Sequence, residues 1–227
     1  MLIRARSIGR RLGLHRIYYR LLPHRNYEEK FHEAILAALK AGDVAWDIGA
    51  NQGFYAKIFC EKTGSGGRVF AFEPTPDSFA ELCRHTAGYP WIRNEMVAMG
   101  DFDGATQMVI GEAHRRNHLQ WNAGESTEAQ GVQVKVISGD SYRAASGNTP
   151  NVVKIDVEGF EEEVLAGMDH LLAAPELRAV FVEVHFRILE ERGRADAPVR
   201  IEKLLRAKGL RPKWVDPSHI AAERISA

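Results

Sequence analysis

Short apolar runs alternate with helical patterns along most of the chain. Five runs have the length of buried strands: 44–48, 68–73, 91–98, 151–157 and 179–185. Apolar residues recur three or four apart at 26–41, 54–61, 77–83, 158–168 and 198–208, which predicts helices there. Two final runs, 210–215 and 219–225, fit an antiparallel pair. Strands that alternate with helices form a parallel sheet covered on both faces, so we predict an α/β fold with a doubly wound, mostly parallel sheet.

Residues 99–141 depart from this alternation. The segments 107–110 and 132–137 have strand patterns, but 111–131 are polar and have no clear period. A stretch of that length inside a domain is typically a functional loop or disordered. Its histidines His114 and His118 fit solvated loop positions better than a lid over a substrate.

Residues 1–25 contain seven arginines and no acidic residue, mixed with apolar residues at helical spacing. One interpretation is a basic amphipathic helix on an anionic polymer or membrane, with peripheral membrane contact through residues 1–22. The other, which we favour, is an extension packed on its own domain or on a second subunit of a homo-oligomer. We divide the chain into a basic helical extension, 1–42, and a main domain, 43–227.

Composition narrows the class of protein. The 227 residues suffice for one α/β domain with a full core, and the 30 basic and 30 acidic residues leave no net charge that would attract a polyanion. Cys60 and Cys83 form no C-x-x-C motif, which disfavours a zinc site or a disulfide framework. No run reaches 18 apolar residues, and the N-terminus lacks the apolar core of a secretory signal. We therefore expect a cytoplasmic protein without a transmembrane segment.

The stretch 44–54 has the pattern strand, glycine-containing turn, helix, with Asp47 in the strand and Gly49 and Gly53 in the turn. Such a turn lets backbone N–H groups approach a ligand closely. The next apolar run ends at Glu73, where an acid can accept hydrogen bonds from ribose hydroxyls. Together these features predict a cofactor that contains a nucleoside.

The turn favours one such cofactor. A dinucleotide site needs G-x-G-x-x-G, but Asn51 stands at the middle glycine position. Asp47 would repel a pyrophosphate and attract the ammonium group of an amino acid. S-adenosylmethionine has that ammonium group, a ribose for Glu73 and no phosphate. We therefore predict S-adenosylmethionine, and a NAD-dependent oxidoreductase is the less favoured alternative.

Four segments of the chain resemble the FkbM-type family of S-adenosylmethionine-dependent methyltransferases. They are D-I-G-A-N-Q-G-F-Y at 47–55, F-E-P-T-P-D-S-F at 72–79, K-I-D-V-E-G-F-E-E-E-V-L-A-G at 154–167 and V-E-V-H at 182–185. The resemblance covers about residues 44–186. It implies a class I, Rossmann-like methyltransferase sheet of seven strands with the last strand inserted antiparallel. It also implies O-methylation of small molecules such as sugars or hydroxylated natural products.

The resemblance also implies which residues bind the cofactor. The residues that it places around the methionine part are Asp47, Gly49, Asn51 and Gly53. It places Glu73 at the ribose, and Val97 and Ala98 near the adenine. The cofactor-binding set further includes Ala50, Phe54, Tyr55, Pro74 and Asp156.

Candidate catalytic residues lie at the ends of the runs 151–157 and 179–185, because doubly wound sheets bind ligands at the carboxyl ends of their strands. His185 titrates near neutral pH and is our candidate for the base that takes the proton of a hydroxyl acceptor; a structural histidine is the alternative. Asp156 and Glu158 are candidates for orienting the substrate. Two carboxylates without a third ligand are weak evidence for a metal, so none is assigned.

Lys154 and Glu183 fall within predicted strands, where an unpaired charge is costly, so we expect these two residues to form an ion pair across neighbouring strands.

We interpret the chain as an S-adenosylmethionine-dependent methyltransferase that acts on a hydroxyl of a small polar molecule. The alternative is a domain that binds the nucleoside cofactor without catalysis and serves as an interaction module. A nucleic-acid methyltransferase is disfavoured, because the sequence has no platform of aromatic and basic residues, and we expect no nucleic-acid partner.

Overall fold

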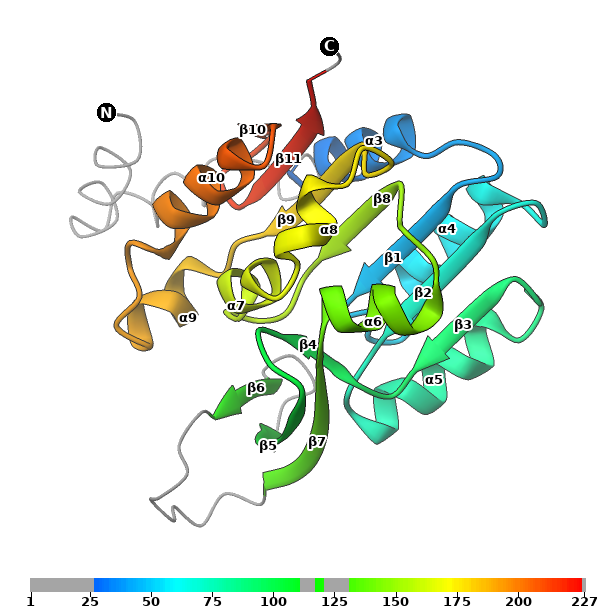
Figure 1. The fold of residues 1–227 in the computed structure, drawn as a ribbon. Helices are drawn as coiled ribbons and strands as arrows, with labels where there is room; N and C mark the ends of the chain where they lie inside the picture. Colours follow the sequence, from blue (N-terminus) through cyan, green and yellow to red (C-terminus); the bar gives the residue numbers. More distant parts are fainter. Residues whose placement is uncertain (1–26, 111–116, 121–130, 226–227) are drawn as a thin grey trace.

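The computed structural model describes residues 27–110, 117–120 and 131–225, which are built around a seven-stranded sheet (Figure 1). In spatial order its strands are β10 (Leu210–Trp214), β11 (His219–Arg224), β9 (Ala179–Glu183), β8 (Val152–Ile155), β1 (Val44–Ile48), β2 (Arg68–Phe72) and β3 (Ile92–Glu95). The last five run parallel, and β11 is antiparallel to both of its neighbours. The predicted α/β fold, with the last strand inserted antiparallel, is confirmed.

Helices cover both faces of this sheet (Figure 1). They are α3 (Tyr27–Ala38), α4 (Phe54–Thr63), α5 (Pro76–Thr86), α6 (Gly139–Ser146), α7 (Glu161–Ala166), α8 (Asp169–Ala173), α9 (Phe186–Glu191) and α10 (Ala197–Ala207). Because side chains alternate along a strand, Ala45 packs with Phe31 and Phe59 of α3 and α4, whereas Trp46 packs with the cluster that includes Leu165 and Ile201 of α7 and α10. The sheet therefore has one apolar core on each face.

A second, four-stranded sheet has the order β4 (Ala98–Gly100), β7 (Gly131–Ser138), β5 (Gly104–Ile110) and β6 (Asn117–Gln120). The prediction of one strand over 91–98 is wrong, because β3 ends at Glu95 and β4 pairs with β7 in the other sheet. A turn in which the N–H of Val97 donates to the carbonyl of Glu95 separates them. The small sheet contains the buried residues Met99, on β4, and Met108, on β5.

Several predicted helix boundaries differ from the structure. The predicted helix 158–168 starts only at Glu161, because Glu158 and Gly159 have left-handed backbone angles, with φ of 51° and 92°. The short helices α6, α8 and α9 were not predicted. Thr75 stands at the N-cap of α5, so this helix begins at Pro76, just before the predicted range 77–83, and it extends to Thr86.

The predicted extension falls partly outside the described residues. Nothing in the structure bears on residues 1–26 or on His114, and β6 carries His118 without a described side chain. Residues 27–38 form α3, which packs on the main sheet, so the division at residue 42 stays a prediction. None of the described helices combines the length and the apolar character needed to cross a bilayer.

Candidate active site

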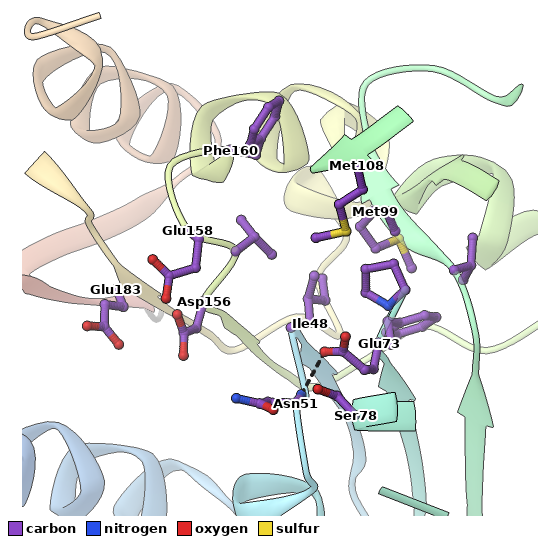
Figure 2. A pocket seen from close by; sticks show the side chains of 16 residues that line it. Ile48, Asn51, Glu73, Ser78, Met99, Met108, Asp156, Glu158, Phe160 and Glu183 are labelled. Atoms are coloured by element: carbon purple, nitrogen blue, oxygen red, sulfur yellow. Dashed lines mark hydrogen bonds between the residues drawn. The ribbon is translucent and has the colours of Figure 1, made fainter. Parts of the chain in front are cut away.

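A cavity of about 440 Å³ lies at the carboxyl ends of the central strands (Figure 2). Ile48 ends β1, Glu73 follows β2, Asp156 follows β8 and Glu183 ends β9, and all four line the cavity. Doubly wound sheets bind ligands at this edge, and the volume is that of an ordinary small-molecule pocket. The fold therefore places one candidate site where the sequence predicted it.

The turn after β1 forms part of the cavity wall through Gly49. Its φ is 75°, and a Cβ there would lie only 1.8 Å from the carbonyl oxygen of Asp156. Its N–H donates to the carbonyl of Phe72, at 3.0 Å. Only glycine lets this turn pass between the ends of β2 and β8, so its backbone borders the cavity.

Glu73 is held in place by its neighbours. Its Oε2 accepts the N–H of Asn51 and its Oε1 accepts the N–H of Thr75, both at 2.9 Å. Asn51 has a left-handed φ of 49°, which asparagine tolerates better than most residues. Burial raises the pKa of Glu73, and the hydrogen bonds from Thr75 and Asn51 oppose that rise. The carboxylate is therefore fixed in orientation and borders the cavity.

An apolar wall faces Glu73 (Figure 2). Pro74, Val97 and Ala98, predicted for cofactor binding, lie in it. It also includes residues that the sequence did not single out: Ile48, Phe72, Met99, Met108, Val157 and Phe160. Ser78 is a further polar lining residue. Ile48 and Phe72 could have been predicted as lining residues, because they end strands next to predicted site residues. Met108 comes from the small sheet, and no sequence pattern indicated that it would line the cavity.

Asp47 is fully buried and does not line the cavity. Its Oδ1 lies 3.1 Å from Nζ of Lys154, which also donates to the carbonyl of Gly49 at 3.0 Å. Burial raises the pKa of Asp47, and Lys154 opposes that rise. The expected Lys154–Glu183 ion pair is wrong, because the register of β1 and β8 sets Asp47 directly beside Lys154, whereas Phe181 stands opposite Lys154 on β9.

The other predicted cofactor residues flank the cavity without lining it. Ala50 is buried in a small core cluster, and Gly53 is the N-cap of α4 with a φ of 89°. Phe54 is 68% exposed. The ring of Tyr55 lies 5.4 Å from Nζ of Lys154. Of the glycine-turn residues, Gly49 and Asn51 line the cavity.

His185, Asp156 and Glu158 come together at the other end of the site. Nε2 of His185 lies 3.6 Å from Oδ1 of Asp156 and 3.4 Å from Oε2 of Glu158. The opposite ring nitrogen, Nδ1, lies 2.7 Å from Oε1 of the fully buried Glu161. Burial alone would lower the pKa of His185, but Glu161, Asp156 and Glu158 raise it to about 9. The three predicted catalytic side chains thus form one cluster.

A second histidine, His219, contacts Glu183. Nε2 of His219 lies 3.4 Å from Oε2 of Glu183, and its Nδ1 lies 2.8 Å from Oδ2 of Asp216. Burial alone would lower the pKa of His219, but Asp216 and Glu183 raise it to about 9. Sequence reasoning singled out neither His219 nor Glu161, since each meets its partner only through the fold.

The family model described as the Methyltransferase FkbM domain matches residues 47–212. The chain is 34% identical over 165 residues to the hexuronic acid methyltransferase AglP of Haloferax volcanii, a match that covers 70% of this chain and 62% of AglP. It is 30% identical over 184 residues to the 31-O-demethyl-FK506 methyltransferase FkbM of Streptomyces tacrolimicus, covering 65% of this chain and 67% of that protein. The match thus spans less than two thirds of the length of AglP.

Among solved structures, the fold resembles that of a methyltransferase FkbM from Methylobacillus flagellatus KT. The TM-score is 0.52 at 17% identity, over 79% of this chain and 43% of that one. The family model covers most of the chain and contains Glu73, Asp156, Glu158 and His185. The chain therefore belongs to the FkbM methyltransferase family, as its motifs predicted.

Proposed function

We propose that this chain is an S-adenosylmethionine-dependent methyltransferase that methylates a hydroxyl group of a small polar molecule, such as a sugar or a natural product. Membership of the FkbM family supports the proposal. The observation that carries it is the charge of the cavity. Its described lining contains Glu73, Asp156, Glu158 and Glu183 and no basic side chain.

This charge favours S-adenosylmethionine over a dinucleotide. The sulfonium and ammonium groups of S-adenosylmethionine are positive and suit a wall of carboxylates, which would repel a pyrophosphate. Oε1 of Glu73 accepts both the N–H and the hydroxyl of Thr75, so Oε2, which accepts only the N–H of Asn51, has a lone pair left for a ribose hydroxyl. Val97 and Ala98 offer an apolar surface to the adenine. These contacts support the cofactor predicted from the sequence.

Asp47 has an indirect role in this proposal. Its carboxylate compensates the ammonium of Lys154, which lies beneath the turn and donates to the carbonyl of Gly49. Without Asp47, the positive charge of Lys154 would be balanced only by Asp156, 3.5 Å away, beneath the site of a cationic cofactor. The Asp47–Lys154 pair therefore supports the turn at Gly49 and keeps the protein beneath the methionine part of the cofactor close to electrically neutral.

The acceptor hydroxyl belongs at Asp156 and Glu158, beside His185. In methyl transfer the new O–CH₃ bond forms as the S–CH₃ bond breaks, and its electron pair stays on sulfur. The hydroxyl also loses a proton. With a pKa of about 9, His185 already carries a proton at neutral pH, which argues against it as the base there. Asp156 and Glu158 are the neighbouring groups that can orient the hydroxyl and accept its proton.

Calorimetry with S-adenosylhomocysteine, and NAD⁺ as the control titrant, tests the cofactor. Methyl transfer from labelled S-adenosylmethionine then tests the reaction, with uronic acids, neutral hexosides and hydroxylated macrocycles as acceptors. We expect binding of S-adenosylhomocysteine alone and a labelled product from at least one acceptor class. Binding without turnover of any acceptor would favour the interaction module, and a preference for NAD⁺ would overturn the cofactor.

A further inference from the structure

We propose that Asp156, Glu158 and His185 form a site for a divalent transition-metal cation, Mn²⁺ or Zn²⁺. The proposal deepens the proposed function and rests on it, since it concerns the wall at which the acceptor is expected. One ligand atom from each of the three side chains lies within 4.8 Å of the other two. The sequence offered only the two neighbouring carboxylates; the fold supplies the third ligand.

His185 is oriented for this task by a buried carboxylate. Oε1 of Glu161 accepts the N–H of Gly159 at 2.8 Å, so it is an acceptor, and Nδ1 of His185 lies 2.7 Å from the same oxygen. Nδ1 therefore carries a hydrogen, and Nε2, which would give up its own proton when a metal binds, is turned toward the cavity carboxylates. Histidines that bind metals commonly donate their other N–H to a carboxylate in this way.

The spacing around Nε2 suits a cation better than direct hydrogen bonds. Nε2 lies 3.6 Å from Asp156 and 3.4 Å from Glu158, and it makes no hydrogen bond to any residue that the structure describes. Hydrogen bonds between a charged nitrogen and a carboxylate are typically about 2.7–2.9 Å long. Ligands about 2.1 Å from a tetrahedral cation are separated by roughly 3.4 Å. Nε2 is thus spaced from each of the two carboxylates as one ligand of such a cation is from another.

The balance of charged side chains around the cluster also favours a bound cation. Asp156 and Glu158 border the cavity with Glu183, whose Oε1 lies 3.8 Å from Nε2 of His185. Two other cations border this wall among the described residues. Lys154 lies 3.5 Å from Asp156 but is shared with Asp47, and His219 lies 3.4 Å from Glu183 but is shared with Asp216. The carboxylates therefore outnumber the cations at this wall, and a divalent ion would offset the excess.

The ligand set selects the class of cation. Two carboxylates and one imidazole are harder than a zinc-finger set and softer than the all-oxygen sites that Mg²⁺ and Ca²⁺ prefer. Three protein ligands also leave coordination positions open. The acceptor's oxygen would occupy one of them, which would lower the pKa of its hydroxyl and align it with the methyl group. Because Asp156 and Glu158 then serve as metal ligands, they no longer accept the proton, which would pass to water.

The test is a titration of MnCl₂, and separately ZnCl₂, into the chelator-treated 227-residue protein, followed by calorimetry and, for Mn²⁺, by electron paramagnetic resonance. Wild type should bind one ion, and MgCl₂ should bind more weakly. Asp156→Asn, Glu158→Gln and His185→Ala should each weaken binding at least tenfold. Glu161→Gln should weaken it about 10–100-fold by releasing the orientation of His185.

Glu73→Gln is the matched control, since it removes a carboxylate from the cofactor end of the same cavity and should leave ion affinity within about twofold. A lack of saturable binding would overturn the site, as would binding that the three ligand variants leave unchanged. Full methyl transfer in the presence of a chelator would also overturn it, while leaving the proposed function intact. Ion binding without methyl transfer to any acceptor would instead support the site and count against the proposed function.

Discussion

The ammonium of Lys154 lies 3.1 Å from Oδ1 of Asp47 inside the sheet, with the two side chains 3% and 0% exposed. Burial alone would lower the pKa of Lys154, but Asp47 and Asp156 hold it above its ordinary value. The two residues are direct neighbours in the register of β1 and β8. Each charge is therefore tolerated in the interior because the other is there.

Removing one partner should cost more than removing both. Lys154→Met leaves a buried carboxylate without its cation and should lower the free energy of unfolding by about 3 kcal/mol or more. Asp47→Leu combined with Lys154→Met should recover much of that loss. Urea denaturation measures both. Lys57→Met, which breaks an exposed pair with Glu61 at 4.0 Å, is the control and should change stability by less than about 1 kcal/mol.

Gly49→Ala should disrupt the turn that borders the cavity. The new Cβ would lie 1.8 Å from the carbonyl oxygen of Asp156, at a φ of 75°. We expect a loss of at least about 2 kcal/mol of stability, together with weaker binding of S-adenosylhomocysteine. Gly66→Ala adds a Cβ with nothing within 4 Å and is the matched control. Equal stability of the two variants would contradict the close approach.

Glu73→Gln should weaken the binding of S-adenosylhomocysteine by about 1.5–3 kcal/mol, because a charge-assisted hydrogen bond to the ribose becomes a neutral one. Calorimetry measures the affinity, and a thermal melt checks that the buried side chain is still accommodated. Glu81→Gln makes the same change on the outer surface of α5 and should bind like wild type. Unchanged affinity in Glu73→Gln would remove Glu73 from the cofactor site.

His219 should make stability depend on pH. Its pKa is raised from the ordinary 6.5 to about 9 by Asp216 and Glu183, so its contribution is fully present below about pH 6.5 and is lost as the pH rises through about 9. We expect the difference in unfolding free energy between wild type and His219→Gln to shrink by about 2–3 kcal/mol from pH 6 to pH 10. Urea denaturation at several pH values measures this difference, and a constant value would show that folding does not raise the pKa of His219.

The local pattern of apolar and polar residues was sufficient to predict much of the fold. The strand, glycine turn and helix at 44–63 and the acid that follows β2 depend on neighbouring residues, and so does the closing hairpin of β10 and β11. The run 91–98 was wrongly predicted as one strand because its residues belong to two sheets. β3 ends at Glu95, and the chain then turns so that β4 pairs with β7. An apolar residue in a sequence indicates that its side chain is buried. Which sheet the residue belongs to depends on strand pairing, which the apolar pattern does not specify.

The sequence by itself determined the family, the alternation of strands and helices in the main sheet, and the presence of Gly49, Asn51, Glu73, Asp156 and Glu158 at strand ends, because these follow from spacing along the chain. Only the tertiary structure decided which charges meet. The register of β1 and β8 joins Asp47 to Lys154, and the end of β9 brings His185 to Glu161, 24 residues away in sequence. Such partners depend on how strands align and helices pack, which no local pattern encodes.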